Sequence, residues 1–228
     1  MKATVVKIGG SLAIKPENLR ALCAKLSEVN RKHKLVIVPG GGEFADVVRK
    51  LDDRYSLSCA VSHRMAILGM DQYGMLLSDL IPNSVTVNTL EQTKKVSDSG
   101  KLPIFLPSRL LFSDNPLENS WDVTSDSIAA YLAGRLHIPK VLLVKDVDGV
   151  YTIDPKKYSG AKLIEKLPVN ELLRLHERTS VDRFLPKLLE TLNIDCIVVN
   201  GLFPERLEAI LDGQRTVCTL ITGNSSQL

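Results

Sequence analysis

Lys7-Ile8-Gly9-Gly10-Ser11 ends a short apolar run and opens onto a segment with helical spacing. Pro39-Gly40-Gly41-Gly42-Glu43 repeats this arrangement further along the chain. Glycine lets the backbone approach an anion closely, amides at the next helix start point towards it, and Lys7 adds a positive charge. One such turn is weak evidence, since many strand-to-helix turns hold glycine for its backbone angles alone. Two turns at neighbouring strand ends predict one phosphate-binding cradle.

Apolar runs and helical patterns alternate along the whole chain, which predicts a mainly parallel α/β sandwich. Residues 35–38 form a continuous apolar run that is too short for a helix, as expected of a strand covered on both faces. Strands are expected at residues 4–8, 35–38, 85–87, 103–106, 141–144, 197–199 and 217–221. Helices are expected at residues 19–29, from 44 onwards, 58–80, 125–136, 172–176, 184–192 and 207–211, with a helical or irregular stretch between 87 and 103.

The composition is that of an ordinary globular chain. Of the 228 residues, 44% are hydrophobic and 24% are charged, so the chain is able to bury a full core as a single domain. No repeat or low-complexity linker divides it. The polar loop at residues 113–120 is expected to form a waist between an N-terminal lobe, about residues 1–120, and a C-terminal lobe, about residues 121–228.

Charge, cysteines and hydropathy limit the partners and the compartment. The net charge of +3 comes from residues spread along the chain, which predicts no nucleic-acid partner and no membrane patch. Cys23, Cys59, Cys196 and Cys218 lie apart in apolar runs, without the paired spacing of zinc or redox motifs, and are expected to be reduced thiols. No apolar stretch approaches the length of a membrane span, and the early strand leaves no room for a signal peptide. A cytoplasmic protein is therefore expected.

The longest acidic motif follows the apolar run at residues 141–144. It extends from Lys145 through residues 146–151 (DVDGVY) to Asp154, Pro155 and Lys156. Ligands of open α/β sheets bind at the carboxyl ends of strands, which favours a functional site here. Asp, Gly and Pro are also the usual residues of a solvated turn, and for the motif taken alone both interpretations have equal weight. The order of the motifs along the chain favours function.

That order resembles the amino-acid kinase family, which includes acetylglutamate, uridylate, carbamate and isopentenyl phosphate kinases. The resemblance covers nearly the whole chain, through the two glycine turns, the helix start at residues 124–130, the element at 146–151, and Lys187. It implies the three-layer αβα sandwich of carbamate kinase-like proteins and an ATP-dependent phosphotransferase. It also implies Mg²⁺ bound with ATP, no metal ligand from the protein, and a homo-oligomer assembled through the N-terminal lobe.

The resemblance also implies roles for individual residues. Lys7 is similar to a lysine that bridges the donor and the transferred phosphate, Lys187 to a second lysine that reaches the ATP phosphates, and Asp126 to an aspartate that holds both ammonium groups. A solvated helix lysine and an acidic residue of a first helical turn are the simpler interpretations of Lys187 and Asp126. The expected phosphate-binding residues are Gly9, Gly10, Ser11, Gly40, Gly41 and Gly42. The expected ATP-binding residues are Lys145, Asp146, Asp148, Gly149, Tyr151, Asp154, Pro155 and Lys156.

Residues 65–74 and 120–127 are similar to an archaeal branch of the family that acts in methanofuran biosynthesis. That branch converts a phosphomonoester, with a primary ammonium and a furan ring, to its diphosphate. A phosphate acceptor has a second pKa of about 6, so it needs no general base. Residues 120–127 also resemble molybdenum storage proteins. Other possibilities are therefore an isopentenyl phosphate kinase, an amino-acid carboxylate kinase, or a non-catalytic nucleotide- or oxyanion-binding member of the fold.

Side chains in these two segments are candidates for binding such an acceptor. Asp71 or Asp122 is expected to pair with the ammonium, Trp121 or Tyr73 to lie against the ring, and Arg64 or the glycine amides to hold the phosphate. An ordinary core residue and an exposed helix residue are the simpler interpretations of Trp121 and Arg64.

Overall fold

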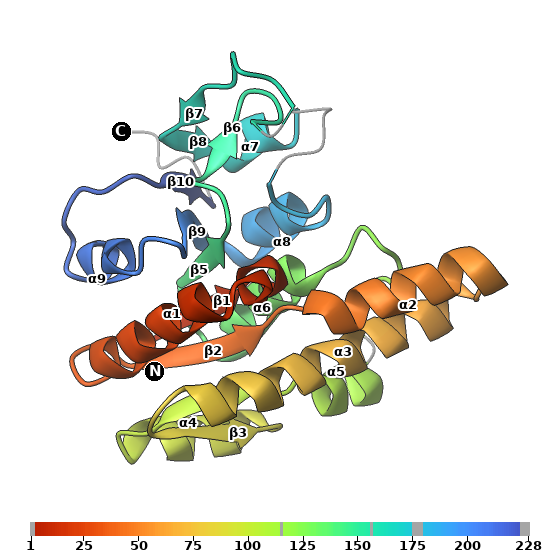
Figure 1. The fold of residues 1–228 in the computed structure, drawn as a ribbon, viewed down its shortest axis with the longest axis horizontal. Helices are drawn as coiled ribbons and strands as arrows, with labels where there is room; N and C mark the ends of the chain where they lie inside the picture. The colour runs from red at the N-terminus through yellow and green to blue at the C-terminus, as the bar shows by residue number, and fades with distance from the viewer. Residues whose placement is uncertain (1–2, 115, 156, 175–179, 224–228) are drawn as a thin grey trace.

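The computed structural model describes residues 3–114, 116–155, 157–174 and 180–223. An eight-stranded sheet runs through the molecule in the order β3-β4-β2-β1-β5-β9-β10-β8 (Figure 1). Its neighbouring strands are parallel except for the antiparallel pair of β9 and β10. The strands of the sheet are β1 (Thr4–Ile8), β2 (Leu35–Pro39), β3 (Ser84–Val87), β4 (Leu102–Phe105), β5 (Lys140–Lys145), β8 (Lys166–Pro168), β9 (Asp195–Asn200) and β10 (Thr219–Thr222). A small antiparallel hairpin contains β6 (Val150–Tyr151) and β7 (Leu163–Ile164).

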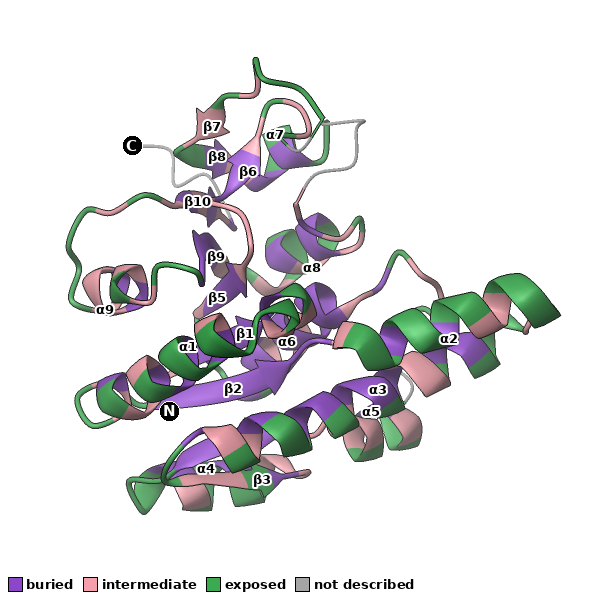
Figure 2. Ribbon diagram, viewed as in Figure 1, coloured by how far each residue is buried: buried purple, intermediate pink, exposed green. Residues whose placement is uncertain are grey.

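Helices cover both faces of the sheet. They are η1 (Gly10–Ile14, a 3-10 helix), α1 (Pro16–Val29), α2 (Gly42–Tyr55), α3 (Cys59–Leu80), α4 (Leu90–Asp98), α5 (Ser108–Asp114), α6 (Ser125–Arg135), α7 (Val169–Leu172), α8 (Leu185–Leu192) and α9 (Glu205–Leu211). One buried cluster joins Val5 and Leu143 of the strands to α6 and α8, and the other joins Val6 and Leu142 to α1 and α9. The central strands β1, β2, β5 and β9 are almost wholly buried between these layers, whereas β3 at the edge of the sheet is only partly buried (Figure 2). The predicted αβα sandwich with a mainly parallel sheet is confirmed.

β1 and β5 join the two halves of the sheet. The first four strands in space, β3, β4, β2 and β1, come from residues before 120, and the other four come from residues after it. β1 and β5 run parallel, with Lys7 opposite Leu143 and Ile8 opposite Val144. Because the carboxyl ends of parallel strands meet at one edge, the turns after β1, β2 and β5 lie close together there.

The ends of several elements differ from the sequence predictions. α2 begins at Gly42, earlier than predicted, and β10 begins at Thr219 rather than at residue 217. The stretch between β3 and β4, predicted as helical or irregular, contains α4, which the Thr89 side chain caps by accepting a hydrogen bond from the amide of Gln92 at 3.1 Å. The helix predicted at residues 172–176 is wrong for most of the described residues, because α7 ends at Leu172 and residues 173–174 form a turn. Residues 175–176 lie outside the described residues.

Several short elements were not predicted. They are η1, α5 and the strands β6, β7 and β8. β6, β7 and β8 contain two or three residues each, which is too few for a period of alternating burial to be visible in the sequence. Within the described ranges, no helix combines the length and apolar character needed to cross a membrane.

Candidate active site

The two glycine turns lie back to back at the ends of β1 and β2. Ile8 is opposite Pro39 in the sheet, so the turns that follow them are neighbours. A β-carbon on Gly10 would overlap the α-carbon and the amide nitrogen of Gly42. Gly42 also has a φ of +55°, in the left-handed region that favours glycine. The predicted pairing of the two turns is therefore present.

Two of the expected phosphate-binding amides are already used by the sheet. The amide of Gly9 donates to the carbonyl oxygen of Val144 at 2.8 Å, and the amide of Gly40 donates to the carbonyl oxygen of Ile8 at 2.8 Å. Gly41 packs against Ala45, whose amide donates to the Gly41 carbonyl. The expectation that Gly9 offers its amide to a phosphate is corrected by the first of these bonds, and the second occupies the amide of Gly40 as well. Both glycines instead let the strand ends approach each other closely.

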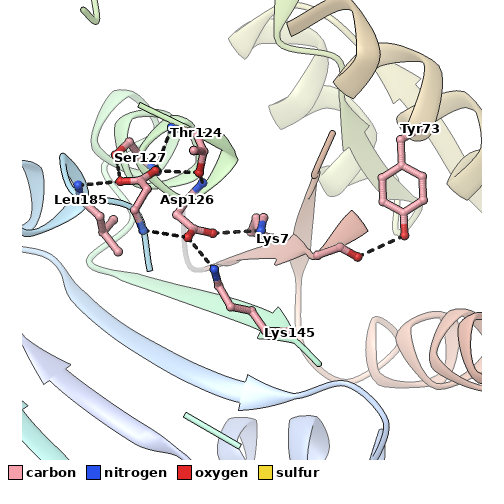
Figure 3. A network of polar contacts seen from close by, with 9 residues as sticks. Lys7, Tyr73, Thr124, Asp126, Ser127, Lys145 and Leu185 are labelled. Atoms are coloured by element: carbon pink, nitrogen blue, oxygen red, sulfur yellow. Dashed lines mark hydrogen bonds and ion pairs between the residues drawn. The ribbon is translucent and has the colours of Figure 1, made fainter. Parts of the chain in front are cut away.

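Asp126 joins two lysines from neighbouring strands (Figure 3). Lys7 Nζ lies 2.9 Å from Asp126 Oδ1, and Lys145 Nζ lies 2.6 Å from Asp126 Oδ2. Lys7 comes two residues after Val5 and Lys145 two residues after Leu143, so both side chains lie on the sheet face that α6 covers. Asp126 belongs to the first turn of α6. The exposed fractions of the Lys7, Asp126 and Lys145 side chains are 7%, 2% and 14%.

Asp182 holds the start of α6 against the start of α8. Its Oδ2 accepts hydrogen bonds from the amide and the hydroxyl of Thr124, both at 2.9 Å, and from the amide of Ser127 at 3.0 Å. Its Oδ1 accepts from Ser127 Oγ at 2.6 Å and from the amide of Leu185 at 2.8 Å. The Asp182 amide donates to Asp126 Oδ2 at 3.2 Å. Asp182 therefore fixes the position of Asp126.

Burial and charge shift the pKa values of these groups. Burial alone would raise the pKa of Asp126, but the charges and hydrogen bonds of Lys145 and Lys7 outweigh it and hold that pKa well below its usual value. Burial, assisted by the charge of Lys145, lowers the pKa of Lys7 in spite of the opposing charge of Asp126. Burial and the charge of Asp126 raise the pKa of Asp182. Asp126 is thus an anion at neutral pH.

A cavity of about 280 Å³ opens beside the end of β5, and we call it the β5 cavity. Its cationic end contains Lys7 and Lys145, next to the first glycine turn. Side chains with apolar surface, including Val147 and Ile153, line the remainder, and such a mixture suits a nucleotide. Five of the expected ATP-binding residues line this cavity, namely Lys145, Asp146, Tyr151, Asp154 and Pro155. The expected phosphate-binding residues Gly9, Gly10 and Ser11 line it as well.

Two further expected ATP-binding residues, Asp148 and Gly149, do not line the cavity. Asp148 Oδ1 pairs with Arg206 Nη1 at 2.6 Å, which ties the turn after β5 to α9. The carbonyl oxygen of Gly149 accepts a hydrogen bond from Ser180 Oγ at 2.9 Å. Asp148 and Gly149 therefore shape the turn, and the expectation that they contact the nucleotide directly is not met in this structure. Lys156 lies outside the described residues.

A second cavity, of about 310 Å³, lies against the start of α2, and we call it the α2 cavity. α2 contributes three charged side chains to its wall, those of Glu43, Asp46 and Arg49. Arg49 Nη1 pairs with Asp46 Oδ1 at 2.6 Å. The α2 cavity and the β5 cavity share four lining residues, which are Lys7, Gly10, Ser11 and Lys145. Ligands in the two cavities would therefore meet at the buried lysines.

A small cavity of about 40 Å³ adjoins the α2 cavity, and we call it the Trp121 cavity. Both are lined by Ala45, Arg49, Thr124 and Ser125. Trp121 Nε1 donates to Asp52 Oδ2 at 2.7 Å, and the Arg49 guanidinium lies 4.9 Å from the centroid of the Trp121 ring. Of the predicted acceptor residues, Trp121 is the one that lines a cavity adjoining the α2 cavity.

The two candidate carboxylates for the acceptor ammonium lie elsewhere. Asp71 accepts hydrogen bonds from the amide of Ser108 at 3.3 Å and from the Ser108 hydroxyl. Asp122 is exposed, and its Oδ1 lies 3.8 Å from Arg183 Nη1. Neither lines the β5, α2 or Trp121 cavity. The sequence prediction for these two residues is not supported by their positions.

The alternative candidates for the acceptor phosphate and ring also lie outside these cavities. The Arg64 guanidinium lies 5.5 Å from the centroid of the Phe112 ring, in a small hollow that shares His63 and Ile67 with the Trp121 cavity. Tyr73 is buried, and its hydroxyl donates to the carbonyl oxygen of Gly9 at 3.4 Å. Tyr73 thus supports the first glycine turn from below rather than facing a ligand.

Lys187 lies apart from Asp126. It is exposed on α8, with its Nζ 5.6 Å from the centroid of the Phe184 ring. It lines none of the three cavities, and both oxygens of Asp126 are paired with Lys7 and Lys145. The expected contact of Asp126 with Lys187 is therefore replaced by a contact with Lys145.

Sequence reasoning missed Asp182, Arg49 and Asp46. The signal for Asp182 was local, because it stands three residues before the first residue of α8, where a carboxylate accepts the free amides of a helix start. Asp46 and Arg49 are three residues apart on α2 and both line the α2 cavity. An acidic and a basic residue at this spacing are typical of an exposed ion pair on a helix. The sequence therefore contains no sign that Asp46 and Arg49 line a cavity.

The donor set suits magnesium that arrives with a nucleotide. Within the described part of the chain, no three His, Cys, Asp or Glu side chains are grouped so that they could hold a metal ion. The β5 cavity nevertheless contains the carboxylates of Asp146 and Asp154. Mg²⁺ is commonly held by one or two carboxylates together with substrate phosphates and water, so these residues fit it.

A parallel α/β sheet with two glycine turns and buried lysines at its carboxyl edge defines a phosphate-binding enzyme. The chain belongs to the amino acid kinase family, whose model matches residues 2–200. It is therefore a kinase, which transfers a phosphoryl group from ATP to a small molecule.

Individual relatives are similar over nearly their whole length. The [5-(aminomethyl)furan-3-yl]methyl phosphate kinase of Methanocaldococcus jannaschii is 39% identical over 219 residues, which cover 96% of this chain and 97% of that protein. The uridylate kinase of Methanococcoides burtonii is 26% identical and covers 91% of this chain and 90% of its own length.

Solved structures share the fold. The uridylate kinase of Archaeoglobus fulgidus has a TM-score of 0.76 at 21% identity, covering 97% of this chain and 100% of its own. The UMP kinase of Bacillus anthracis has a TM-score of 0.78 at 20% identity, covering 98% and 97%. At this identity the two structures establish the fold alone.

Proposed function

We propose that this kinase transfers the γ-phosphoryl group of ATP to [5-(aminomethyl)furan-3-yl]methyl phosphate and so forms the diphosphate used in methanofuran biosynthesis. The observation that carries the transfer is the meeting of the β5 and α2 cavities at Lys7 and Lys145. The acceptor is suggested by the Methanocaldococcus jannaschii relative, whose name states that substrate.

ATP is proposed to bind in the β5 cavity and the acceptor in the α2 cavity. The first belongs mostly to the C-terminal lobe, about residues 121–228, and the second mostly to the N-terminal lobe, about residues 1–120. Gly10, Ser11 and Gly42 would then face the transferred phosphoryl group. Mg²⁺ bound to ATP would neutralise charge on the phosphates, next to Asp146 and Asp154.

The proposed step exchanges one phosphorus–oxygen bond for another. An oxygen of the acceptor phosphate forms a bond to the γ-phosphorus, while the bond from that phosphorus to the bridging oxygen breaks and ADP leaves with the electron pair. The acceptor phosphate is already ionised near neutral pH, so no proton has to be removed. Lys7 contributes by neutralising charge on the phosphoryl oxygens, which is the main demand of this reaction.

The α2 cavity offers a partner for each group of the proposed acceptor. Its phosphate would pair with the Arg49 guanidinium, and its ring would reach the Trp121 cavity. Its ammonium would pair with the carboxylate of Asp46 or Glu43. These assignments take the place of Arg64, Asp71 and Asp122, which lie outside the cavity.

Lys187 stays in the proposal as a contact of the ATP phosphates. It is exposed at the start of α8, and α8 is attached to α6 through Asp182. Its ammonium does not reach the shared end of the cavities in this structure, so the proposal gives it a role in binding ATP rather than in holding Asp126.

A homo-oligomer and a cytoplasmic location complete the proposal. Val61, Leu68 and Met75 are exposed at seven-residue spacing along α3 and so form one apolar stripe on that helix. A second copy of the chain could cover this stripe with its own, and light scattering of the purified protein tests the oligomer directly. The four cysteines are free, as expected in a reducing compartment where ATP is available.

A substrate screen with labelled ATP tests the proposed function. The acceptors are aminomethylfuran phosphate, its analogue without the amine, isopentenyl phosphate, UMP and N-acetylglutamate. We expect the highest kcat/KM with aminomethylfuran phosphate and a diphosphate product. A higher kcat/KM with another acceptor would reassign the substrate, and no turnover with any of them would indicate a non-catalytic member of the family.

A further inference from the structure

Lys145 is placed to do more than line a nucleotide site. It is the last residue of β5, and its ammonium pairs with Asp126 at 2.6 Å, on the other carboxylate oxygen from Lys7 (Figure 3). The two strands that carry these lysines are hydrogen-bonded neighbours, and both side chains lie under α6. The carboxylate of Asp126 therefore holds both ammonium groups at the end that the β5 and α2 cavities share.

The position of Lys145 differs from that of the other expected ATP-binding residues. Asp146, Tyr151, Asp154 and Pro155 line the β5 cavity and not the α2 cavity. Lys145 lines both, as do Lys7, Gly10 and Ser11. A residue that binds only the adenosine end of a nucleotide has no reason to face the second cavity.

A purely structural role in an ion pair with Asp126 does not explain why Lys145 is a lysine. Asp126 already has a cationic partner in Lys7, and a second buried ammonium on the same carboxylate repels the first. Taking such a charge out of water is unfavourable unless an anion compensates it. Asp182, a second buried carboxylate next to Asp126, is engaged by the amides and hydroxyls at the start of α6. An anion bound between the cavities would relieve the repulsion between the lysines.

We propose that Lys145 is a catalytic residue whose ammonium contacts the transferred phosphoryl group, together with Lys7. This inference rests on the proposed phosphoryl transfer and assigns the second cation of the site to β5 rather than to Lys187. During transfer, the phosphorus leaves the bridging oxygen of ATP and bonds to the acceptor oxygen. The Lys145 side chain neutralises the equatorial oxygens, which carry the most charge midway between the two bonds.

The test separates the γ-phosphate from the rest of the nucleotide. Calorimetry measures the Kd of Mg·ADP and of the magnesium complex of ATP's β,γ-imido analogue for the intact chain and for Lys145→Met. Lys140→Met, at the opposite end of the same strand, is the matched control. We expect Lys145→Met to raise the Kd of the analogue about tenfold or more, the loss of one charge-assisted contact, and to leave that of ADP nearly unchanged.

Turnover gives a second measurement. Lys145→Met should lower kcat about 100-fold, as the loss of one electrostatic contact in a transition state does, and Lys145→Arg should recover part of it. If Lys145→Met does not fold, as judged by its melting curve, Lys145→Gln takes its place. Equal weakening of ADP and analogue, or no weakening of either, would overturn the proposal. In a further outcome, the wild-type chain turns over none of the acceptors while Lys145→Met still raises the Kd of the analogue and not that of ADP. That result would refute the proposed function and support the contact of Lys145 with the γ-phosphate.

Discussion

Gly10 and Gly42 touch across two turns that lie more than thirty residues apart in the chain, and a β-carbon on Gly10 would overlap the backbone of Gly42. The clash is with backbone atoms, which cannot rotate away, so the turns would have to separate. Gly10→Ala is expected to lower the free energy of unfolding by about 2 kcal/mol. It should also lower the turnover of ATP by the protein that remains folded, because the two turns line the site. Urea denaturation and steady-state kinetics measure both. Gly160→Ala is the control, since nothing lies within 4 Å of its β-carbon.

Asp182 links the starts of α6 and α8, and replacing it should show how much this link contributes to the stability of the fold. Asp182→Ala leaves the amides of Thr124, Ser127 and Leu185 without their acceptor. We expect a loss of about 3 kcal/mol in the free energy of unfolding, because several partly buried donors lose their partner together. Asp122→Ala, at an exposed carboxylate, should change stability very little. Equal denaturation midpoints for both variants would show that Asp182 does not hold α6 and α8.

The fold followed from local signals in the sequence. Apolar runs such as residues 35–38 and the glycine turns are properties of short segments, and a parallel sheet brings the carboxyl ends of its strands together wherever the turns stand in the chain. Lys7 was singled out from the glycine turn in which it stands, whereas Asp126 was singled out through the resemblance to the amino-acid kinase family.

The partner of Asp126 could not be found in this way. Lys145 reaches it because β1 and β5 are neighbours in register, and Lys187 misses it because α8 presents that residue to solvent. Such pairings depend on strand order and helix rotation, which no window of sequence contains. Asp71 likewise carried the right charge for an ammonium but points to Ser108, away from the α2 cavity.

The α2 cavity predicts how the acceptor ammonium is recognised. Asp46→Asn keeps the shape of the side chain and removes its charge, so KM for aminomethylfuran phosphate should rise about tenfold. KM for the analogue without the amine should not change, and neither should KM for ATP. Asp122→Asn serves as the control at an exposed carboxylate outside the cavity. If Asp46→Asn affects both acceptors equally, the carboxylate does not pair with the ammonium, and Glu43 is the next residue to test.

Lys187 and Lys145 predict different kinetic defects. The proposal gives Lys187 a contact with the ATP phosphates, so Lys187→Met should raise KM for ATP about tenfold. Since Lys187 lines neither the β5 cavity nor the α2 cavity, kcat should change only slightly. Lys166→Met, at an exposed position of β8, controls for the loss of a surface charge. A fall of kcat as large as that of Lys145→Met would show instead that Lys187 reaches the phosphoryl group during the reaction.

The lowered pKa of Lys7 predicts an alkaline limit to activity. Its ammonium is the active form, and burial moves its pKa below the ordinary 10.5, so kcat/KM for ATP should fall as the pH rises through that lowered value. The phenol of Tyr73 does not compete in this range, because burial raises its pKa. Lys7→Arg keeps a charge that does not titrate, so whatever activity it retains should stay level to higher pH. A wild-type profile that is flat up to pH 10.5, or one that Lys7→Arg reproduces, would show that Lys7 does not set the limit.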